Sequence, residues 1–195
     1  MKITFISDTH NKHNHLTSNA YNNILGGGDV LVHAGDCTSM GKSHEITNFL
    51  NWFAMTDFKY KIFIAGNHDF GFEMHTDIAE EFKEKGIIYL FDSEVVIDGV
   101  KFYGSPWQPE FYDWAFNLPR GEKLAEKWAK IPGNTDILIT HGPAHGMLDW
   151  TPSGQRVGCE DLFHRIMEVQ PKIHVCGHIH CAYGQKNFNG VEFLN

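Results

Sequence analysis

Short apolar runs alternate along the chain with longer amphipathic stretches. Eight runs rich in β-branched or aromatic residues, each bounded by Gly, Asp or Pro, predict buried strands. They are KITFIS (2–7), DVLVHAG (29–35), KIFIAG (61–66), EVVIDG (94–99), VKFYGS (100–105), DILITHG (136–142), KIHVCG (172–177) and GVEFLN (190–195). Apolar residues at helical spacing predict helices at Ser43–Met55, Thr76–Lys85, Gly121–Lys130 and Cys159–Val169. The alternation predicts an α/β fold.

Five of the predicted strands are followed directly by side chains that bind metals or carry protons. In chain order these side chains are Asp8, His10, Asp36, Asn67, His68, Asp69, His141, His178 and His180. Ligand sites of open α/β sheets lie outside the carboxyl ends of the strands. We therefore expect groups that are scattered through the sequence to converge in one site.

The number of donors in this set indicates more than one metal ion. Seven side chains are candidate ligands: Asp8, His10, Asp36, Asn67, His141, His178 and His180. A tetrahedral ion takes only four, so we expect two ions that share one carboxylate. Mixed imidazole and carboxylate ligands suit manganese first, with iron, zinc or cobalt as alternatives.

Such a pair of ions favours chemistry at phosphorus. Two ions about 3.5–4 Å apart clamp the attacking and leaving oxygens of an in-line displacement and lower the pKa of a bound water towards ~7. His68 lies beside Asn67 but is left over from the ligand count. Its position predicts a general acid that protonates the leaving alkoxide.

Composition and charge narrow the class of protein. With 195 residues, of which 42% are hydrophobic, we expect one domain over residues 1–195. Acidic residues outnumber basic ones by 24 to 16 and no basic stripe is visible, which disfavours binding of duplex nucleic acid.

No run reaches membrane-spanning length and the amino terminus has no leader pattern, so a cytoplasmic protein without membrane contact is expected. Four cysteines without CxxC spacing predict reduced thiols. The sequence neither predicts nor excludes a homodimer.

The sequence resembles the calcineurin-like metallophosphoesterases. DTH, GD, GNHD, THG and GHIH occur in the order of the five motifs of that family, from Asp8 to His180. HAGDCTSMG, GSPWQPEFYDWAFN and THGPAHG further resemble the MPPED type, which is related to the class III cyclic nucleotide phosphodiesterases. The resemblance implies an αββα sandwich of two mixed β-sheets flanked by helices, with the metals at one edge.

The resemblance also implies a role for each site residue. Asp8, His10 and His180 would hold the first ion, and Asn67, His141 and His178 the second. Asp36 would bridge the two ions, and His68 would be the proton donor to the leaving group. Relatives usually continue beyond GVEFLN, so the outer edge of one sheet is expected to be short or differently covered.

The predicted function is hydrolysis of small phosphodiesters, such as cyclic nucleotides, by in-line attack of a metal-bound hydroxide. Protein phosphatases of the family carry an Arg in the second motif and GNHE in the third, whereas this chain has GDCTSMG and ends the third motif in Asp69. Only three arginines occur, which favours diesters because dianionic monoesters are usually held by Arg clamps. The alternatives are a broad-specificity phosphomonoesterase or nucleotidase, a single-strand nuclease, and a non-catalytic metal- or nucleotide-binding regulator.

Three further residues are predicted to contact the substrate. Trp107 belongs to the aromatic segment SPWQPEFYDWAFN, which either caps a sheet face or forms a wall for a nucleobase. Arg156 and His145 follow the THG motif and are placed where they could reach a substrate. Among the other histidines, His33 is expected to pack below the site and His174 to lie at the surface.

Overall fold

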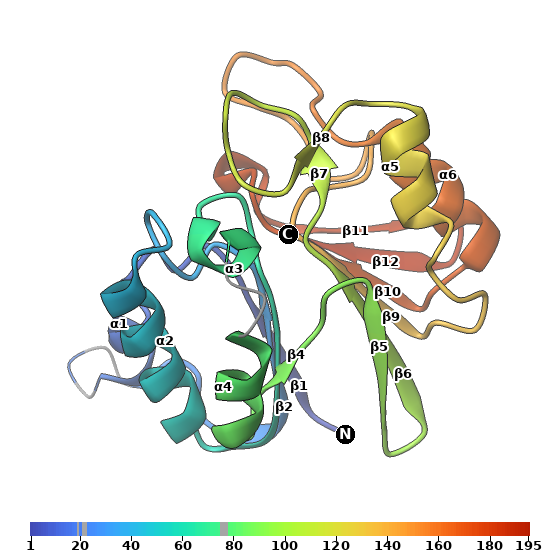
Figure 1. Ribbon diagram of the computed structural model, residues 1–195. Helices are drawn as coiled ribbons and strands as arrows, with labels where there is room; N and C mark the ends of the chain where they lie inside the picture. Colours follow the sequence, from blue (N-terminus) through green and yellow to red (C-terminus); the bar gives the residue numbers. More distant parts are fainter. Residues whose placement is uncertain (19, 21–22, 75–77) are drawn as a thin grey trace.

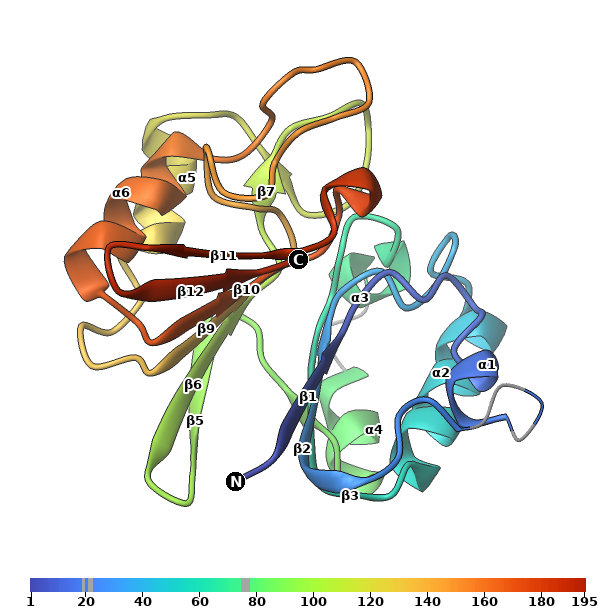
Figure 2. The ribbon, with the colours of Figure 1, turned by 180° about the vertical axis from the view of Figure 1, so that it is seen from behind.

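Two β-sheets pack face to face, and helices cover the outer face of each sheet, as Figures 1 and 2 show from opposite sides. This computed structural model describes the chain except for residues 19, 21–22 and 75–77. The arrangement is the αββα sandwich that the resemblance implies. The start of the helix expected from Thr76 lies outside the described residues.

The first sheet is parallel, whereas two mixed sheets were expected, and its strand order is β1-β2-β3-β4. Its strands are β1 (Ile3–Ile6), β2 (Gly28–Ala34), β3 (Phe58–Ile64) and β4 (Ile88–Tyr89). The helices on its outer side are α1 (Asn14–Thr17), α2 (Ser43–Met55), α3 (Phe70–Met74) and α4 (Ile78–Glu84). Helix α2 has the predicted bounds, and the Glu45 carboxylate caps its first turn by accepting a hydrogen bond of 2.9 Å from the Lys42 N–H.

The second sheet is mixed, with the strand order β11-β12-β10-β9-β6-β5. The strands are β5 (Ser93–Ile97), β6 (Val100–Ser105), β9 (Ile137–Thr140), β10 (Ile173–Val175), β11 (Gln185–Phe188) and β12 (Val191–Leu194). The four central strands are parallel, and β5 and β11 are antiparallel edges. Helices α5 (Glu122–Trp128) and α6 (Glu160–Val169) cover its outer face.

Smaller elements complete the description. A separate pair of two-residue strands, β7 (Gln108–Pro109) and β8 (Asn117–Leu118), lies above α3 in Figure 1. A 3-10 helix, η2 (His180–Ala182), follows the last predicted motif. The strand predicted from GVEFLN is β12, and its outer edge is covered by β11 rather than being short.

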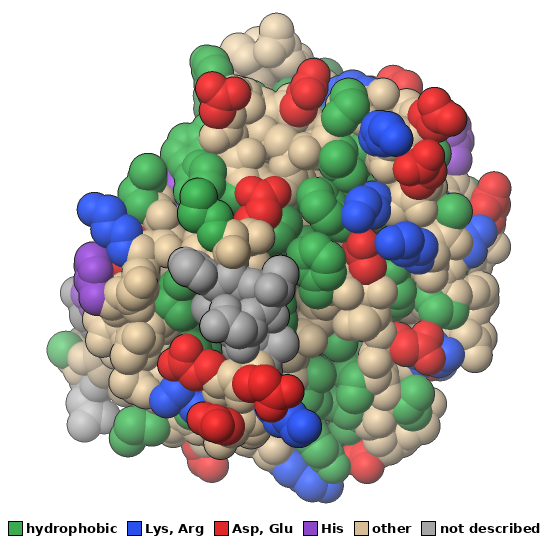
Figure 3. Space-filling model, in the orientation of Figure 1, with side chains coloured by type: hydrophobic (Ala, Val, Ile, Leu, Met, Phe, Trp, Pro, Cys, Tyr) green, Lys and Arg blue, Asp and Glu red, His purple; other side chains and the backbone are tan. Residues whose placement is uncertain are grey.

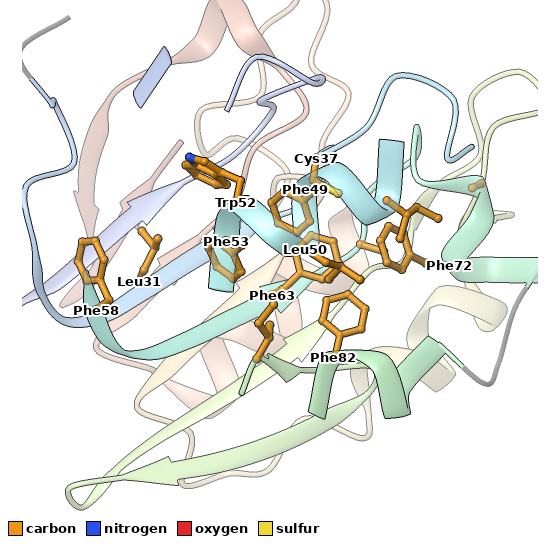
Figure 4. Close-up of a cluster of buried hydrophobic side chains, with 14 of the residues drawn as sticks. Leu31, Cys37, Phe49, Leu50, Trp52, Phe53, Phe58, Phe63, Phe72 and Phe82 are labelled. Carbon is orange, nitrogen blue, oxygen red and sulfur yellow. The ribbon is translucent and has the colours of Figure 1, made fainter. Parts of the chain in front are cut away.

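Side chains alternate between two apolar layers along each inner strand. In β2, Val30 and Val32 face the second sheet and pack in a cluster with Ile139 and Phe102, whereas Leu31 faces α2. Figure 4 shows the cluster between the first sheet and its helices, which is rich in phenylalanine. A third cluster fills the space between the second sheet and its helices α5 and α6. Both sheets are therefore buried on two faces, which fixes their strand ends relative to one another.

The surface carries both signs of charge. On the face shown in Figure 3, the described acidic and basic side chains are interspersed, with no continuous basic band. Within the described part of the chain, no helix combines the length and the apolar character needed to span a bilayer.

Candidate metal centre

The carboxyl ends of five strands meet at one edge of the sandwich. Strands β1, β2 and β3 of the first sheet run into the loops of the first three motifs, and β9 and β10 of the second sheet run into the last two. Three sets of donor atoms, each within 4.8 Å of one another, form there: Asp8, His10 and His180; His10, Asp36 and His68; and Asp36, His141 and His178. The convergence expected from the sequence is confirmed, and the individual ligand roles stay predictions.

One oxygen of Asp36 lies at the middle of this cluster. Asp36 Oδ2 is 3.3 Å from Nε2 of His141, 3.8 Å from Nε2 of His10 and 4.0 Å from Nε2 of His68. Its other oxygen, Oδ1, accepts a hydrogen bond of 2.8 Å from the His68 N–H. The side chain is 2% exposed, so a desolvated carboxylate faces three imidazole nitrogens.

The remaining donors lie on both sides of Asp36. On one side, His180 Nε2 is 3.1 Å from Asp8 Oδ1 and 3.4 Å from His10 Nε2. On the other side, Asn67 Oδ1 is 3.0 Å from His141 Nε2. These contacts form two groups of donor atoms, one on each side of Asp36.

Main-chain carbonyl groups fix the orientation of two of these imidazole rings. Nδ1 of His10 is 3.1 Å from the Thr38 carbonyl oxygen, and Nδ1 of His141 is 2.9 Å from that of Ala34. A carbonyl only accepts, so Nδ1 donates in both rings and Nε2 is the nitrogen directed at the site. This second hydrogen bond is what orients histidine ligands in metal sites. The residues present therefore fit a metal centre.

Carboxylates and imidazoles of the site shift one another's pKa values. Burial alone would lower the pKa of His141, but Asp36 and Asp8 outweigh it and raise that pKa to about 9. Burial would likewise raise the pKa of Asp36, yet the charge of His141 and its hydrogen bond lower it. Burial together with the charge of His141 lowers the pKa of His178 to about 4. A proton on His141 thus occupies the place in the charge balance that a bound cation would take.

The backbone of the ligand loops adopts rare conformations. Asp8, His10, Asp36 and His178 all have positive φ, between 40° and 68°. Non-glycine residues seldom adopt this region, and such strain is typical of functional sites. The close approach also explains a glycine of the motifs, since a Cβ on Gly66 would collide with the Asp36 carboxylate.

Asp69 connects the loops of the second and third motifs. Its carboxylate accepts hydrogen bonds of 2.9 Å from the N–H groups of Asp36, Thr38 and Gly66, and one of 2.7 Å from the Thr38 hydroxyl. Burial raises its pKa to about 6. Asp69 is therefore a structural residue of the site.

Two buried histidines support the ligand loops from below. His33 Nε2 is 2.9 Å from the Thr9 hydroxyl, which confirms its predicted place under the site. His174 Nε2 is 2.8 Å from the Thr140 hydroxyl, which in turn donates to the Gly142 carbonyl. The predicted surface position of His174 is wrong: the residue is 1% exposed, because β10 lies inside the sheet and is covered on both faces.

The three predicted substrate contacts lie outside the donor sets. Trp107 Nε1 donates to Asp92 at 3.0 Å, and the Lys127 ammonium lies over its ring. Arg156 pairs with Asp149 at 3.0 Å and stacks on Trp150. His145 Nδ1 is 3.8 Å from Asp149. Substrate contact by these residues stays a prediction.

A further residue packs against His68, one that the sequence did not single out. The ring of Trp114 packs against the His68 imidazole, with centroids 4.1 Å apart. Nδ1 of His68 is also 2.8 Å from the Ser39 carbonyl oxygen. Every residue type has a main-chain carbonyl, and Trp114 is one of several aromatic residues in its segment. Neither contact could therefore be predicted from the sequence.

A cavity of about 910 Å³ adjoins the donor cluster beside Asp8 and His180. Apolar side chains of β1, β10 and β12, namely Phe5, Val175 and Leu194, line it together with Lys12. Its volume falls in the range of small-molecule sites, about 300–1,000 Å³. A small organic ligand in this cavity would lie beside Asp8 and His180.

Residues 1–182 match the family described as calcineurin-like phosphoesterase. The chain belongs to this family. It is 45% identical over 218 residues to human metallophosphoesterase domain-containing protein 1, and the match covers all of this chain and 65% of that protein. A UPF0046 protein of Caenorhabditis elegans is 36% identical over 208 residues, covering all of this chain and 69% of the relative.

A solved structure has the same fold. The crystal structure of TT1561 of Thermus thermophilus superposes with a TM-score of 0.71 and 13% identity, covering 98% of this chain and 87% of that one. At this identity the likeness concerns the fold alone. It agrees with the αββα architecture described above.

Proposed function

We propose that this calcineurin-like phosphoesterase hydrolyses small phosphodiesters, such as cyclic nucleotides, with the help of two metal ions. Asp8, His10 and His180 would hold one ion and Asn67, His141 and His178 the other, with Asp36 shared between them. The observation that carries the proposal is the single Asp36 oxygen lying within 4.0 Å of three imidazole nitrogens, among donors from five strand ends.

The bound ions would offset charge on the phosphoryl oxygens and lower the pKa of the attacking water. The protein supplies the remaining steps. Nδ1 of His68 donates to the Ser39 carbonyl, so the ring acts as an acid in its imidazolium form, whose second proton is on Nε2, which faces the cluster. As the bond from phosphorus to the leaving oxygen breaks, that oxygen keeps the electron pair and takes the Nε2 proton. The attacking water forms the new P–O bond and releases its proton to solvent.

The distribution of arginine supports a diester rather than a monoester. All three arginines have partners away from the donor cluster: Arg120 donates to the Gly158 carbonyl, Arg156 to Asp149, and Arg165 to Glu168. Among the described contacts, none joins an arginine to the seven candidate ligands. A dianionic monoester would lack its usual bidentate clamp here, whereas a diester carries one charge less.

The test measures turnover by protein loaded with Mn²⁺ on bis(p-nitrophenyl) phosphate, p-nitrophenyl phosphate and a panel of cyclic nucleotides. We expect kcat/KM to be higher for the diesters, and His68→Ala to lower kcat on cyclic nucleotides by about 10²-fold. Monoester turnover exceeding diester turnover would favour a phosphomonoesterase. Metal binding without turnover of any of these esters would favour a regulator instead.

A further inference from the structure

The segment that carries Trp114 is fastened to the loop that carries His68. The Ala115 N–H donates to the Asn67 carbonyl oxygen at 3.1 Å. The Phe116 N–H donates to the Glu73 carboxylate of α3 at 3.0 Å, and Phe116 itself is fully buried. Two hydrogen bonds and a buried anchor therefore hold residues 114–116 in register with Asn67 and His68.

Because the segment is held in this way, the Trp114 ring covers one side of the His68 ring. The two ring centroids are 4.1 Å apart with an angle of 42° between the planes, and the Phe70 ring lies 5.8 Å from Trp114. On another side, the His10 ring meets His68 edge-on, with centroids 4.7 Å apart. The imidazole is thus enclosed between an aromatic ring and a candidate metal ligand.

The Ser39 hydrogen bond holds Nδ1 of a His68 side chain that is still 28% exposed. Packing against the rest of the ring therefore also bears on the direction of Nε2. Rotation towards solvent would move Nε2 away from Asp36 Oδ2, from which it is 4.0 Å distant. Trp114, whose ring centroid is 4.1 Å from that of His68, would restrict such a rotation.

We propose that Trp114 is a positioning residue that keeps His68 Nε2 directed at the leaving oxygen of the substrate. This inference rests on the proposed function, in which His68 gives its Nε2 proton to that oxygen. A misplaced donor slows proton transfer without changing how the phosphoryl group is bound. Loss of Trp114 should therefore lower kcat, leave KM unchanged, and matter most for leaving groups that require a proton.

The kinetic test compares two diesters that differ only in the leaving group, methyl phenyl phosphate and methyl p-nitrophenyl phosphate. In Mn²⁺-loaded protein, Trp114→Ala should lower kcat about 10²-fold for the phenyl ester and only a few-fold for the nitrophenyl ester, whose phenolate leaves without a proton. Trp114→Phe should restore most of the loss, since it keeps an aromatic face. Tyr112→Ala is the matched control, because Tyr112 is an exposed aromatic residue of the same segment.

A second measurement needs neither metal nor turnover. In metal-free protein, the NMR resonance of the His68 Cε1 proton, assigned with His68→Ala, should carry a ring-current shift from Trp114. Trp114→Ala should move that resonance and Tyr112→Ala should not. Unfolding curves of each variant show whether the fold is kept.

The outcomes distinguish a failure of the positioning role of Trp114 from a failure of the proposed function. Equal losses of kcat on both esters, a change confined to KM, or an unmoved His68 resonance would each overturn the role of Trp114. A rise in KM alone would make Trp114 a binding surface for substrate. Absence of turnover by the metal-loaded wild type on both esters would refute the proposed function itself and, with it, this inference.

Discussion

The described histidines of this protein differ in role, depending on what each ring nitrogen meets. The rings of His10 and His141 donate through Nδ1 to main-chain carbonyls and present Nε2 to the site. His33 and His174 are buried and bonded to threonine hydroxyls. His13 is fully buried beside the Phe49 and Trp52 rings, and neither of its ring nitrogens has a hydrogen-bond partner among the described residues. The same kind of side chain thus serves as a candidate metal ligand, as a hydrogen-bonded support below the site, or as a packed core residue.

Replacing His13 by Phe should reduce the loss of stability in acid. Burial lowers the pKa of His13 to about 4, below its unfolded value of 6.5, so the unfolded state binds more protons between these values. The stability that neutral His13 contributes is complete above pH 6.5 and is lost as the pH falls towards 4. Linkage gives a loss of about 2 kcal/mol between pH ~7.5 and ~5.0.

Urea unfolding of wild type and His13→Phe at these two pH values measures the difference. Trp52→Phe serves as a control, since it alters the same packing without changing a titrating group and should destabilise equally at both pH values. An identical pH dependence for His13→Phe and wild type would contradict the prediction.

At the scale of elements, the site is made by loops that are tied to one another rather than by any one helix or strand. The loop after β2 and the loop after β3 meet at the Asp69 carboxylate, which accepts from both. The loop after β1 joins them through the His10 N–H, which donates to the Asp36 carbonyl oxygen at 3.1 Å. Parallel strands bring these loops to one edge, and the hydrogen bonds then set their relative positions.

Replacing Asp69 by Ala should therefore weaken both the fold and metal binding. The change leaves several buried N–H groups without an acceptor, which should lower the free energy of unfolding by about 3 kcal/mol or more. Asp69→Asn should lose less, because its amide keeps one accepting oxygen. Denaturant unfolding and Mn²⁺ titration measure the two effects, with the exposed Asp113→Ala as control. Normal metal affinity in a destabilised Asp69→Ala would show that the loops hold their geometry without it.

For the whole molecule, the donor cluster joins the two sheets. Asp8, Asp36 and Asn67 come from the first sheet, and His141 and His178 from the second. The His178 N–H also donates to the Asp8 carboxylate at 3.1 Å, across the interface between the sheets. Metal binding should consequently act on the stability of the complete sandwich.

Removal of metal should lower the melting temperature, and the size of the effect should depend on which ligand is changed. Mn²⁺ at about 100 times its Kd should stabilise the protein by about 2.7 kcal/mol. Asp36→Asn should reduce the content of both ions and most of this stabilisation, whereas His180→Ala should chiefly remove one ion. Elemental analysis and thermal unfolding measure these effects. Two ions retained by Asp36→Asn would exclude the shared carboxylate.

The sequence by itself determined the elements and the identity of the clustered donors. All eight predicted strands and the four longer helices are present, because apolar periodicity reflects which face each element buries. The short elements α1, α3, β4, β7 and β8 were not predicted, since two to five residues hold too little periodicity, and the edge strand β11 is exposed throughout. Convergence of the donors followed from the rule that parallel strands share a carboxyl edge.

Only the tertiary structure decided how these donors face one another. It placed Asp36 Oδ2 at the centre, directed Nε2 of His10 and His141 at the site, and put Trp114 against His68. It also showed that His174 is buried. The sequence could not predict this, since it does not show which strand lies inside the sheet. The physical reason is common to all four: main-chain carbonyls carry no residue identity, and contacts between distant segments depend on how the two sheets stack.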